Sequence, residues 1–274
     1  MKNEIPVIKV EADTLPEAWE KAVLKTWEDG LAIKTEYDKT GDPSSRDCTM
    51  IMVIDRPFME PRIHRAFPGS LEDLEVYRQE VVYGIHDAWI KPEEGKWTYT
   101  YHQRLFDYGA SGSGIDQIGY IIDKLSKVPH TRRAQAITWD PASDPQTGDP
   151  PCLQRIWCRL VELSDGRLSL NMNTHWRSRD AHKASFMNIY ALTDLQRHMA
   201  EEISRLAGKA VDVGRYVDIS DSFHIYGSYA GEFKNFLAMI GKRSFEERTW
   251  DTKFAEPFFD DARKRIEGEI KVHG

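Results

Sequence analysis

Cys152 is the residue of this chain whose setting best suits nucleophilic chemistry. It follows Pro150 and Pro151 and opens the apolar segment LQRIWCRLVEL. The prolines hold the backbone extended ahead of the cysteine, and the apolar segment has the pattern of a buried strand, so the thiol is held in a defined position. A lone cysteine in such a segment is more often a small core side chain than a nucleophile. Both roles are therefore open for Cys152.

The region around this cysteine also contains side chains suited to a phosphate, to the edge of a heterocycle and to a sugar hydroxyl. Arginine suits a phosphate because its planar guanidinium forms two charge-assisted hydrogen bonds at once. A carboxamide both donates and accepts, and so it can bind a heterocycle edge. The side chains concerned are Arg132, Arg133, Arg177, Ser178, Asp180, Asn188, His224 and Tyr226.

The pair Arg132-Arg133 precedes a predicted strand. Adjacent side chains of an extended segment point to opposite faces, so both arginines could bind one phosphate only at an unusual backbone or at a subunit interface. A solvated pair is the ordinary interpretation of such a motif.

Two further candidates lie earlier in the chain. Arg46 ends the turn-rich loop KTGDPSSRD, just ahead of a strand predicted over residues 49–54, and this is a common position for an anion ligand. Glu80 borders the apolar face of a helix predicted over residues 70–85. Partial burial would raise the pKa of its carboxyl and suit it to proton transfer, whereas a boundary charge is the ordinary role of such a residue.

The composition fits a single domain over residues 1–274 that binds neither nucleic acid nor membrane. The formal net charge is -7, so any anionic ligand depends on a local arginine cluster. The three cysteines have no CxxC spacing, which argues against a disulfide framework or a metal site and fits a reducing cytoplasm. No apolar run approaches the length of about 18 residues that a spanning helix needs.

Hydrophobic periodicity predicts an α/β chain. The first half is expected to contain a strand over 4–11, a helix over 15–29 with a capping box from Thr14 and Glu17, and a helix over 115–125 behind the loop GASGSG. The second half is expected to contain a strand at 134–139, a hairpin of 153–163 and 167–176, a helix over 188–206 stopped by Gly208, a strand at 211–220, a helical return over 223–240 and a helix over 256–269.

The order of the chemical motifs resembles that of the thymidylate synthases. In that family an Arg-Arg pair leads a strand, a Pro-Cys supplies the nucleophile, an Arg-Ser-x-Asp follows a hairpin, an Asn lies eight residues later, and a His-x-Tyr closes the series. Here these motifs are Arg132-Arg133, Pro151-Cys152, Arg177-Ser178-Arg179-Asp180, Asn188 and His224-Ile225-Tyr226. The resemblance covers Asp116 to Tyr226 and is thinner before it, where Arg46, Glu80 and Tyr101 fall in matching positions.

The resemblance implies a thymidylate synthase-like fold, in which a curved mixed sheet is flanked by helices and packs back-to-back in a homodimer. Arg132 and Arg133 would then reach the phosphate of the partner subunit, and Arg46 and Arg177 would bind the phosphate of their own. Asn188 would bind the pyrimidine edge, which favours uracil because a carboxylate at that position favours cytosine. The sugar 3′-hydroxyl would lie between His224 and Tyr226, and Ser178 and the Asp180 backbone would help hold phosphate and base.

The implied reaction is methylation of dUMP at carbon 5 to give dTMP, with 5,10-methylenetetrahydrofolate or a related pterin. A Cys152 thiolate, its pKa lowered by nearby arginines, would add at carbon 6 and make carbon 5 nucleophilic. Glu80 and Tyr101 would manage the proton transfers. Trp89, Asp180 and Ala184 would line the folate site.

Three positions depart from the family pattern. Leu153 follows the nucleophile where the commoner members have histidine, Ala184 stands where a glycine usually lines the folate site, and the segment EGEIKVHG replaces the apolar tail that closes over the folate. Closure excludes water from the methylene intermediate. The alternative is therefore hydroxymethylation of dUMP, dCMP or CMP, in which water attacks the exocyclic methylene. A protein that binds a nucleotide or RNA as a regulator, with Cys152 as a structural relic, is a third interpretation.

Overall fold

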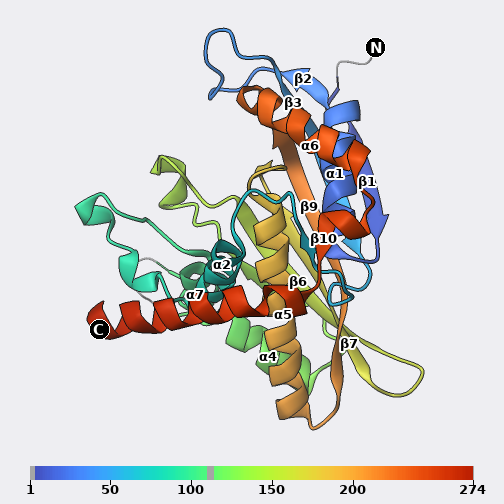
Figure 1. Cartoon of the computed structure of the whole chain (residues 1–274). Coiled ribbons are helices and arrows are strands. Elements are labelled where there is room, and N and C mark those ends of the chain that lie inside the picture. Colours follow the sequence, from blue (N-terminus) through green and yellow to red (C-terminus); the bar gives the residue numbers. More distant parts are fainter. Residues whose placement is uncertain (1–3, 110–113, 274) are drawn as a thin grey trace.

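The computed structural model describes residues 4–109 and 114–273, and these form a mixed sheet with helices packed against it (Figure 1). The strands of the main sheet are β1 (Val7–Ala12), β2 (Leu31–Ile33), β3 (Ser45–Ile54), β5 (Gln135–Ile137), β6 (Leu153–Glu162), β7 (Leu168–Trp176), β8 (Arg179–Asp180) and β9 (Val211–Ile225). A separate two-stranded ladder joins β4 (Ile63–His64) to β10 (Thr249–Trp250).

The helices lie between groups of these strands along the chain. They are α1 (Leu15–Asp29), α2 (Leu71–Tyr83), α3 (Tyr101–Phe106), α4 (Gln117–Lys127), α5 (Ser185–Ala207), α6 (Ala230–Lys242) and α7 (Thr252–His273). Single 3-10 turns lie at Asp87–Trp89, Pro92–Glu94, Asp144–Gln146, Gly227–Tyr229 and Glu246–Arg248.

The sheet is ordered β1-β3-β9-β7-β6-β5, and the central strand β9 pairs with β3, β7 and β8. The β1–β3 and β7–β9 ladders are parallel, and the β3–β9 and β6–β7 ladders are antiparallel. Register shifts interrupt three ladders, between Cys48 and Met50, between Leu153 and Arg155, and between Leu170 and Met172. Bulges of this kind increase local twist, so the sheet curves around the elements that it carries.

The core lies where α1 and α5 pack on the sheet, with α2 and α7 stacked outside α5 (Figure 1). The face of α5 predicted to point inward, which carries Leu192, Leu195, Met199 and Ile203, is buried. Trp19 of α1 is fully buried and donates from its indole N–H to the carbonyl of Ala181, 3.0 Å away. This bond joins α1 to the turn that precedes α5.

Most predicted elements are confirmed, within a few residues at their ends. Gly84 and Gly208 end α2 and α5 in the left-handed conformation, and Ser70 with Asp73 forms a capping box on α2. The capping box predicted for α1 is wrong. The Thr14 side chain makes no cap hydrogen bond, and Glu17 instead forms an ion pair with Lys21 at 2.8 Å.

One further prediction is wrong at its boundary, and another falls partly outside the described residues. The helical return predicted over residues 223–240 begins too early, because β9 continues to Ile225 to complete its ladder with β3 and α6 starts only at Ala230. Of the loop GASGSG, residues 110–113 lie outside the described residues. Among residues 4–109 and 114–273, no helix combines the length and apolar character needed to cross a membrane.

Candidate active site

The backbone ahead of Cys152 is held by Arg177. The Arg177 guanidinium donates from Nε to the carbonyl of Pro151 at 3.0 Å and from Nη2 to the carbonyl of Pro150 at 2.6 Å. Its backbone N–H donates to the carbonyl of Cys152 at 2.9 Å. One arginine therefore fixes the segment that presents the thiol, as expected of a rigid approach.

The Cys152 thiol is partly buried, and burial raises its pKa above the ordinary value. Arg177 and Arg179 act in the opposite direction, while the Asp149 carboxylate raises the pKa further. The expected lowering by arginines is thus outweighed by desolvation. The thiol is protonated at neutral pH in the absence of a ligand.

Glu80 and Tyr101, predicted as a proton-transfer pair, line the same cavity of about 370 Å³, together with Asp149. The Tyr101 hydroxyl lies 3.4 Å from the backbone N–H of Leu153, directly after Cys152. Its ring packs edge-on against the buried Trp176 at 5.7 Å between ring centroids. Burial, followed by the effect of Cys152, raises the pKa of Tyr101 to about 12. The two predicted groups and the cysteine segment therefore meet around one space.

The Arg-Ser-x-Asp motif is attached to the central strand through β8. Asp180 pairs with His224 in the β8–β9 ladder, and the next residue, Ala181, donates its N–H to the His224 carbonyl at 2.8 Å. The Asp180 carboxylate accepts from the N–H groups of His182 at 3.0 Å and Lys183 at 2.8 Å. These bonds fix the turn that leads into α5, where Ala184 is the N-cap residue.

His224 and Tyr226 line a second cavity, of about 270 Å³, together with Ser178 and Asp47. The Ser222 hydroxyl donates to the Asp47 carboxylate at 2.9 Å, and Nδ1 of His224 lies 3.2 Å from the same hydroxyl oxygen. Because the single hydroxyl proton points to Asp47, we assign the ring proton to Nδ1, which leaves Nε2 as an acceptor.

Nε2 of His224 is buried and has no hydrogen-bond partner within the described residues. Burial lowers the pKa of this imidazole to about 4, so it is neutral at physiological pH. A buried acceptor without a partner is unfavourable in the free protein and is satisfied by a ligand that brings a donor. The cavity therefore suits a hydroxyl group.

Asn188, the residue predicted to bind the edge of the pyrimidine, is buried at the start of α5. Its Nδ2 donates to the Tyr77 hydroxyl of α2 at 2.7 Å. Burial raises the pKa of Tyr77 well above its ordinary value, so this partner stays neutral. A carboxamide has one more N–H and an oxygen, and these remain available for a base edge.

The arginines predicted to bind phosphate do not meet in one chain. Arg46 was expected on a mobile loop, but it lies inside β3, where it pairs with Ala32 of β2 and donates to the Gly30 carbonyl at 3.2 Å. Arg132 and Arg133 are exposed and precede the edge strand β5. Three strands separate β3 from β5, and at about 4.8 Å per strand this places the two groups on the order of 19 Å apart.

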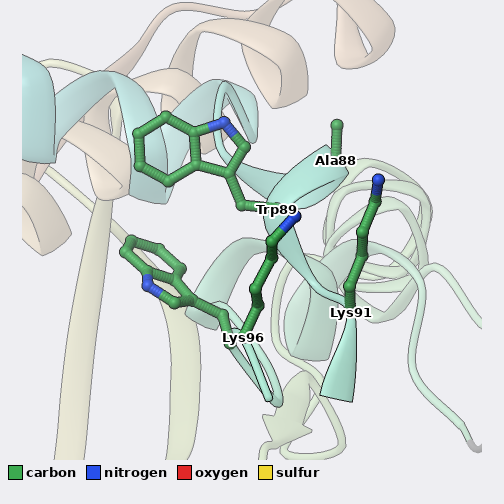
Figure 2. A pocket seen from close by; sticks show the side chains of 5 residues that line it. Ala88, Trp89, Lys91 and Lys96 are labelled. Atoms are coloured by element: carbon green, nitrogen blue, oxygen red, sulfur yellow. The ribbon is translucent and has the colours of Figure 1, made fainter. Parts of the chain in front are cut away.

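A third cavity, of about 670 Å³, lies beside Trp89 and is lined by Trp97, Ala88, Lys91 and Lys96 (Figure 2). The two indoles pack edge-to-face with ring centroids 5.4 Å apart. Both are partly exposed, Trp89 at 45% and Trp97 at 41%. An aromatic wall with two lysines at its rim suits a flat ring system that carries acidic groups.

Several residues that line these cavities or contact the predicted site residues could not be singled out from the sequence, namely Asp47, Tyr77, His86, Asp149 and Ser222. Ser222 and His224 share one face of a strand, which is a detectable signal, but the position of Asp47 depends on the β3–β9 register. Across residues 4–109 and 114–273, no group of three or more His, Cys, Asp or Glu side chains is arranged to hold a metal ion.

Comparison with known proteins gives three kinds of match. A family model described as thymidylate synthase matches residues 71–248. A protein of Methanocaldococcus jannaschii with the name "Putative thymidylate synthase" is 28% identical over 222 residues, which are 79% of this chain and 90% of that protein. A protein of the same name from Methanosarcina mazei is 28% identical over 227 residues, 82% of this chain and 93% of that protein.

The structural match is to the thermostable thymidylate synthase A of Bacillus subtilis. The TM-score is 0.58 at 18% sequence identity, and the match covers 81% of this chain and 83% of the other. At this level of identity the match concerns the fold. The predicted fold, a mixed sheet flanked by helices, is confirmed.

Proposed function

This chain belongs to the thymidylate synthase family of enzymes, and we propose that it transfers a one-carbon unit to carbon 5 of a pyrimidine nucleoside monophosphate, with methylation of dUMP to dTMP as its reaction. The observation that carries the proposal is the meeting of the Cys152 segment with Glu80 and Tyr101 around one cavity. Carbon 5 of a uracil is a poor nucleophile until a thiolate adds at carbon 6, and its hydrogen must then be removed by a base.

Cys152 is the nucleophile in this proposal. Burial raises the pKa of its thiol, whereas the charges of Arg177 and Arg179 lower it and favour the thiolate, so the thiol proton passes to solvent as the sulfur adds to carbon 6. Addition forms the sulfur–carbon 6 bond and places negative charge on carbon 5 and oxygen 4. Tyr101, which stays protonated, lies at the nucleophile segment and can donate to that oxygen directly or through water.

Glu80 is the proposed base for the hydrogen on carbon 5. Burial raises its pKa above the ordinary value of a carboxyl group, which brings the group nearer to the working pH of an acid–base catalyst. Once carbon 5 carries the one-carbon unit, elimination of the Cys152 thiolate breaks the sulfur–carbon 6 bond and restores the carbon 5–carbon 6 double bond of the pyrimidine.

The proposed contacts with the nucleotide involve the cavity lined by His224 and Tyr226, the carboxamide of Asn188 and two arginines. The acceptor Nε2 of His224, with Tyr226 and Ser178 beside it, suits the sugar hydroxyl. The carboxamide of Asn188 suits the uracil edge. Arg177 and Arg46 would bind the phosphate on their own side.

The cavity of Trp89 is where we propose that 5,10-methylenetetrahydrofolate binds. The aromatic wall and the rim lysines fit a pterin and its acidic tail (Figure 2). When bound there, this group supplies the one-carbon unit and, for methylation, the hydride. Trp89 and Trp97 would orient its ring. Asp180 and Ala184, near the start of α5, are not among the residues that line this cavity and would contact the bound group from another side.

A homodimer would complete the phosphate site. Arg132 and Arg133 are exposed and lie far from the phosphate-binding group of their own chain, so they can serve a partner subunit. The outward face of the sheet near them carries the exposed apolar residues Ile137 and Val161. The same face carries the exposed Arg155 and Arg159, so a partner that packs against it would make both apolar and charged contacts.

Product analysis tests the proposal. The protein is incubated separately with dUMP, dCMP and CMP, each with methylenetetrahydrofolate, and the products are identified by mass spectrometry while absorbance reports dihydrofolate. We expect dUMP to gain one methyl in place of hydrogen, with dihydrofolate formed in equal amount. A reaction with none of the three nucleotides would contradict the proposal and favour the binding protein.

Hydroxymethylation is the second candidate, and the exposure of the aromatic wall favours it. Trp89 and Trp97 are nearly half exposed, so water can approach the position of an exocyclic methylene. In that case the nucleotide gains a hydroxymethyl group and tetrahydrofolate is released unoxidised. The same experiment distinguishes the two products.

Asn188→Asp is expected to change the base preference from uracil toward cytosine. The carboxylate no longer donates to oxygen 4 of uracil, but it accepts from the exocyclic amine of cytosine. A ratio of kcat/KM values for dUMP and dCMP that shifts by about 100-fold corresponds to the loss of one such buried contact. Tyr77→Phe is the control, since it removes the partner of Asn188 without changing the carboxamide. An unchanged ratio in Asn188→Asp would mean that this residue does not face the base.

A further inference from the structure

His86 contacts the proposed base Glu80, which lines one cavity, and Trp89, which lines another. Its Nδ1 lies 2.8 Å from Oε2 of Glu80, and the two side chains are only 10% and 12% exposed. Glu80 lines the cavity that contains Tyr101, whereas the His86 ring stacks on Trp89, which lines the cavity shown in Figure 2. The centroids of His86 and Trp89 are 3.9 Å apart, with 22° between the planes.

The local sequence explains how residue 86 returns to residue 80. Gly84 ends α2 in the left-handed conformation, and its N–H donates to the Glu80 carbonyl at 3.1 Å. A left-handed residue reverses the chain at the end of a helix, and glycine adopts this conformation without a steric penalty. The reversed chain brings the imidazole against the last turn of α2.

The hydrogen bond restricts the carboxyl group to one orientation. A glutamate has three rotatable side-chain bonds, and a partner that is itself held by stacking removes much of this freedom. Nδ1 is the donor to a carboxylate, and Nε2 forms no hydrogen bond with any residue of the described chain.

We propose that His86 is a positioning residue of this enzyme, which orients the Glu80 carboxyl toward carbon 5 and sets the pH range in which that carboxyl accepts the proton. The inference rests on the proposed role of Glu80 in the reaction. The His86 side chain also places an imidazole beside Glu80 in a chain that has Leu153 directly after Cys152.

The charges around Glu80 determine the sign of the expected effect. Burial raises the pKa of Glu80, His86 lowers it, and the nearby Asp87 carboxylate raises it. The other ionisable groups that face this carboxyl are Tyr77 of α2 and the cavity residues Lys96, Tyr99, Tyr101 and Asp149. Without His86, the raising effects of burial and Asp87 have less opposition, so the ionised form of Glu80 is reached only at higher pH.

His86→Phe keeps an aromatic ring against Trp89 and removes the hydrogen bond. The measurement is tritium release from carbon 5 of labelled dUMP with methylenetetrahydrofolate, as a function of pH. We expect kcat to fall by at least about 10-fold with little change in the KM for dUMP, and the rising limb of the profile to move up by about one pH unit. His86→Asn, whose amide nitrogen takes the place of Nδ1, is expected to restore much of kcat.

His102 provides a matched control. Its Nδ1 lies 2.6 Å from Asp87, and its ring stacks on Phe106 at 4.2 Å, so it is also an imidazole between a carboxylate and an aromatic ring. His102→Phe leaves the Glu80–His86 hydrogen bond intact and alters only the partner of Asp87, so it is expected to retain kcat and to move the rising limb by much less than His86→Phe. The Cys152 adduct with 5-fluoro-dUMP reports folding and nucleotide binding in every variant, because it forms without removal of a proton from carbon 5.

The outcomes separate this inference from the proposed function. A His86→Phe variant that forms the adduct and has the kcat and pH profile of the unaltered protein overturns the inference alone. The inference is also overturned if His102→Phe moves the rising limb of the pH profile as far as His86→Phe does. The shift would then come from the loss of any nearby imidazole and not from the hydrogen bond to Glu80. An unaltered protein that forms no adduct and releases no tritium overturns the proposed function and this inference with it.

Discussion

Cys152→Ser is expected to lose the covalent adduct with 5-fluoro-dUMP and to lower kcat by at least about 10⁴-fold. A serine hydroxyl in this position has no nearby base to remove its proton, whereas a thiol is intrinsically more acidic and the charges of Arg177 and Arg179 favour its thiolate. The clamp from Arg177 to the two proline carbonyls acts on the backbone, so it survives the substitution. Mass spectrometry of the intact protein reports the adduct, and a dUMP assay reports kcat.

Cys158 gives the control for this experiment. It lies on β6, it is fully buried, and burial raises the pKa of its thiol to about 12. Cys158→Ala is therefore expected to retain the adduct with unchanged stoichiometry. Full turnover by Cys152→Ser would exclude both methylation and hydroxymethylation through this cysteine.

Asp218→Asn is expected to lower the free energy of unfolding by about 3–5 kcal/mol, because it leaves the buried charge of Arg179 without its counterion. The Asp218 side chain is fully buried and that of Arg179 is 1% exposed. The Asp218 carboxylate also accepts from Tyr216 at 3.0 Å, from Thr174 at 3.1 Å and from the Trp176 indole at 3.1 Å. Equilibrium unfolding in guanidinium chloride measures the change.

Asp212→Asn is the matched control on the same strand. Asp212 forms its ion pair with Arg167 at the surface, where both side chains are about half exposed. Exposed pairs contribute little to stability because water and salt screen them. An Asp218→Asn variant as stable as Asp212→Asn would mean that the Arg179 charge is compensated in another way.

Helices and hairpins were predicted well because their signals are local. The inward faces of α2 and α5 follow from residues three and four apart, and the β6–β7 hairpin follows from two apolar runs joined by Ser-Asp-Gly. The capping box predicted for α1 does not form, because the sequence pattern does not show that Glu17 pairs with Lys21 instead. The ends of strands were predicted less accurately, since the length of β9 depends on its pairing with β3 and β7.

The site residues that were predicted lie in motifs of fixed spacing, and those that were missed come from pairings across the sheet or across helices. Arg46 was placed on a loop because Gly and Pro precede it, yet the short strand β2 pairs with its segment and extends β3 to Ser45. Tyr77 gives no signal until α2 and α5 pack together and bring it to Asn188. The direction of the Cys152 pKa shift depends on burial, which spacing between residues does not report.

The position of β9 in the sheet has a consequence for how the protein acquires activity. Its partners β3 and β7 lie far from it in sequence, and their pairing with β9 sets the Asp47–Ser222–His224 contacts and attaches Asp180. Contacts of high sequence separation close large loops and form late in folding. Local helices and the β6–β7 hairpin can exist earlier in a compact intermediate. Nucleotide binding therefore arises only with the slow, cooperative closure of the whole sheet, and a chain still emerging from the ribosome remains inactive until β9 has been made.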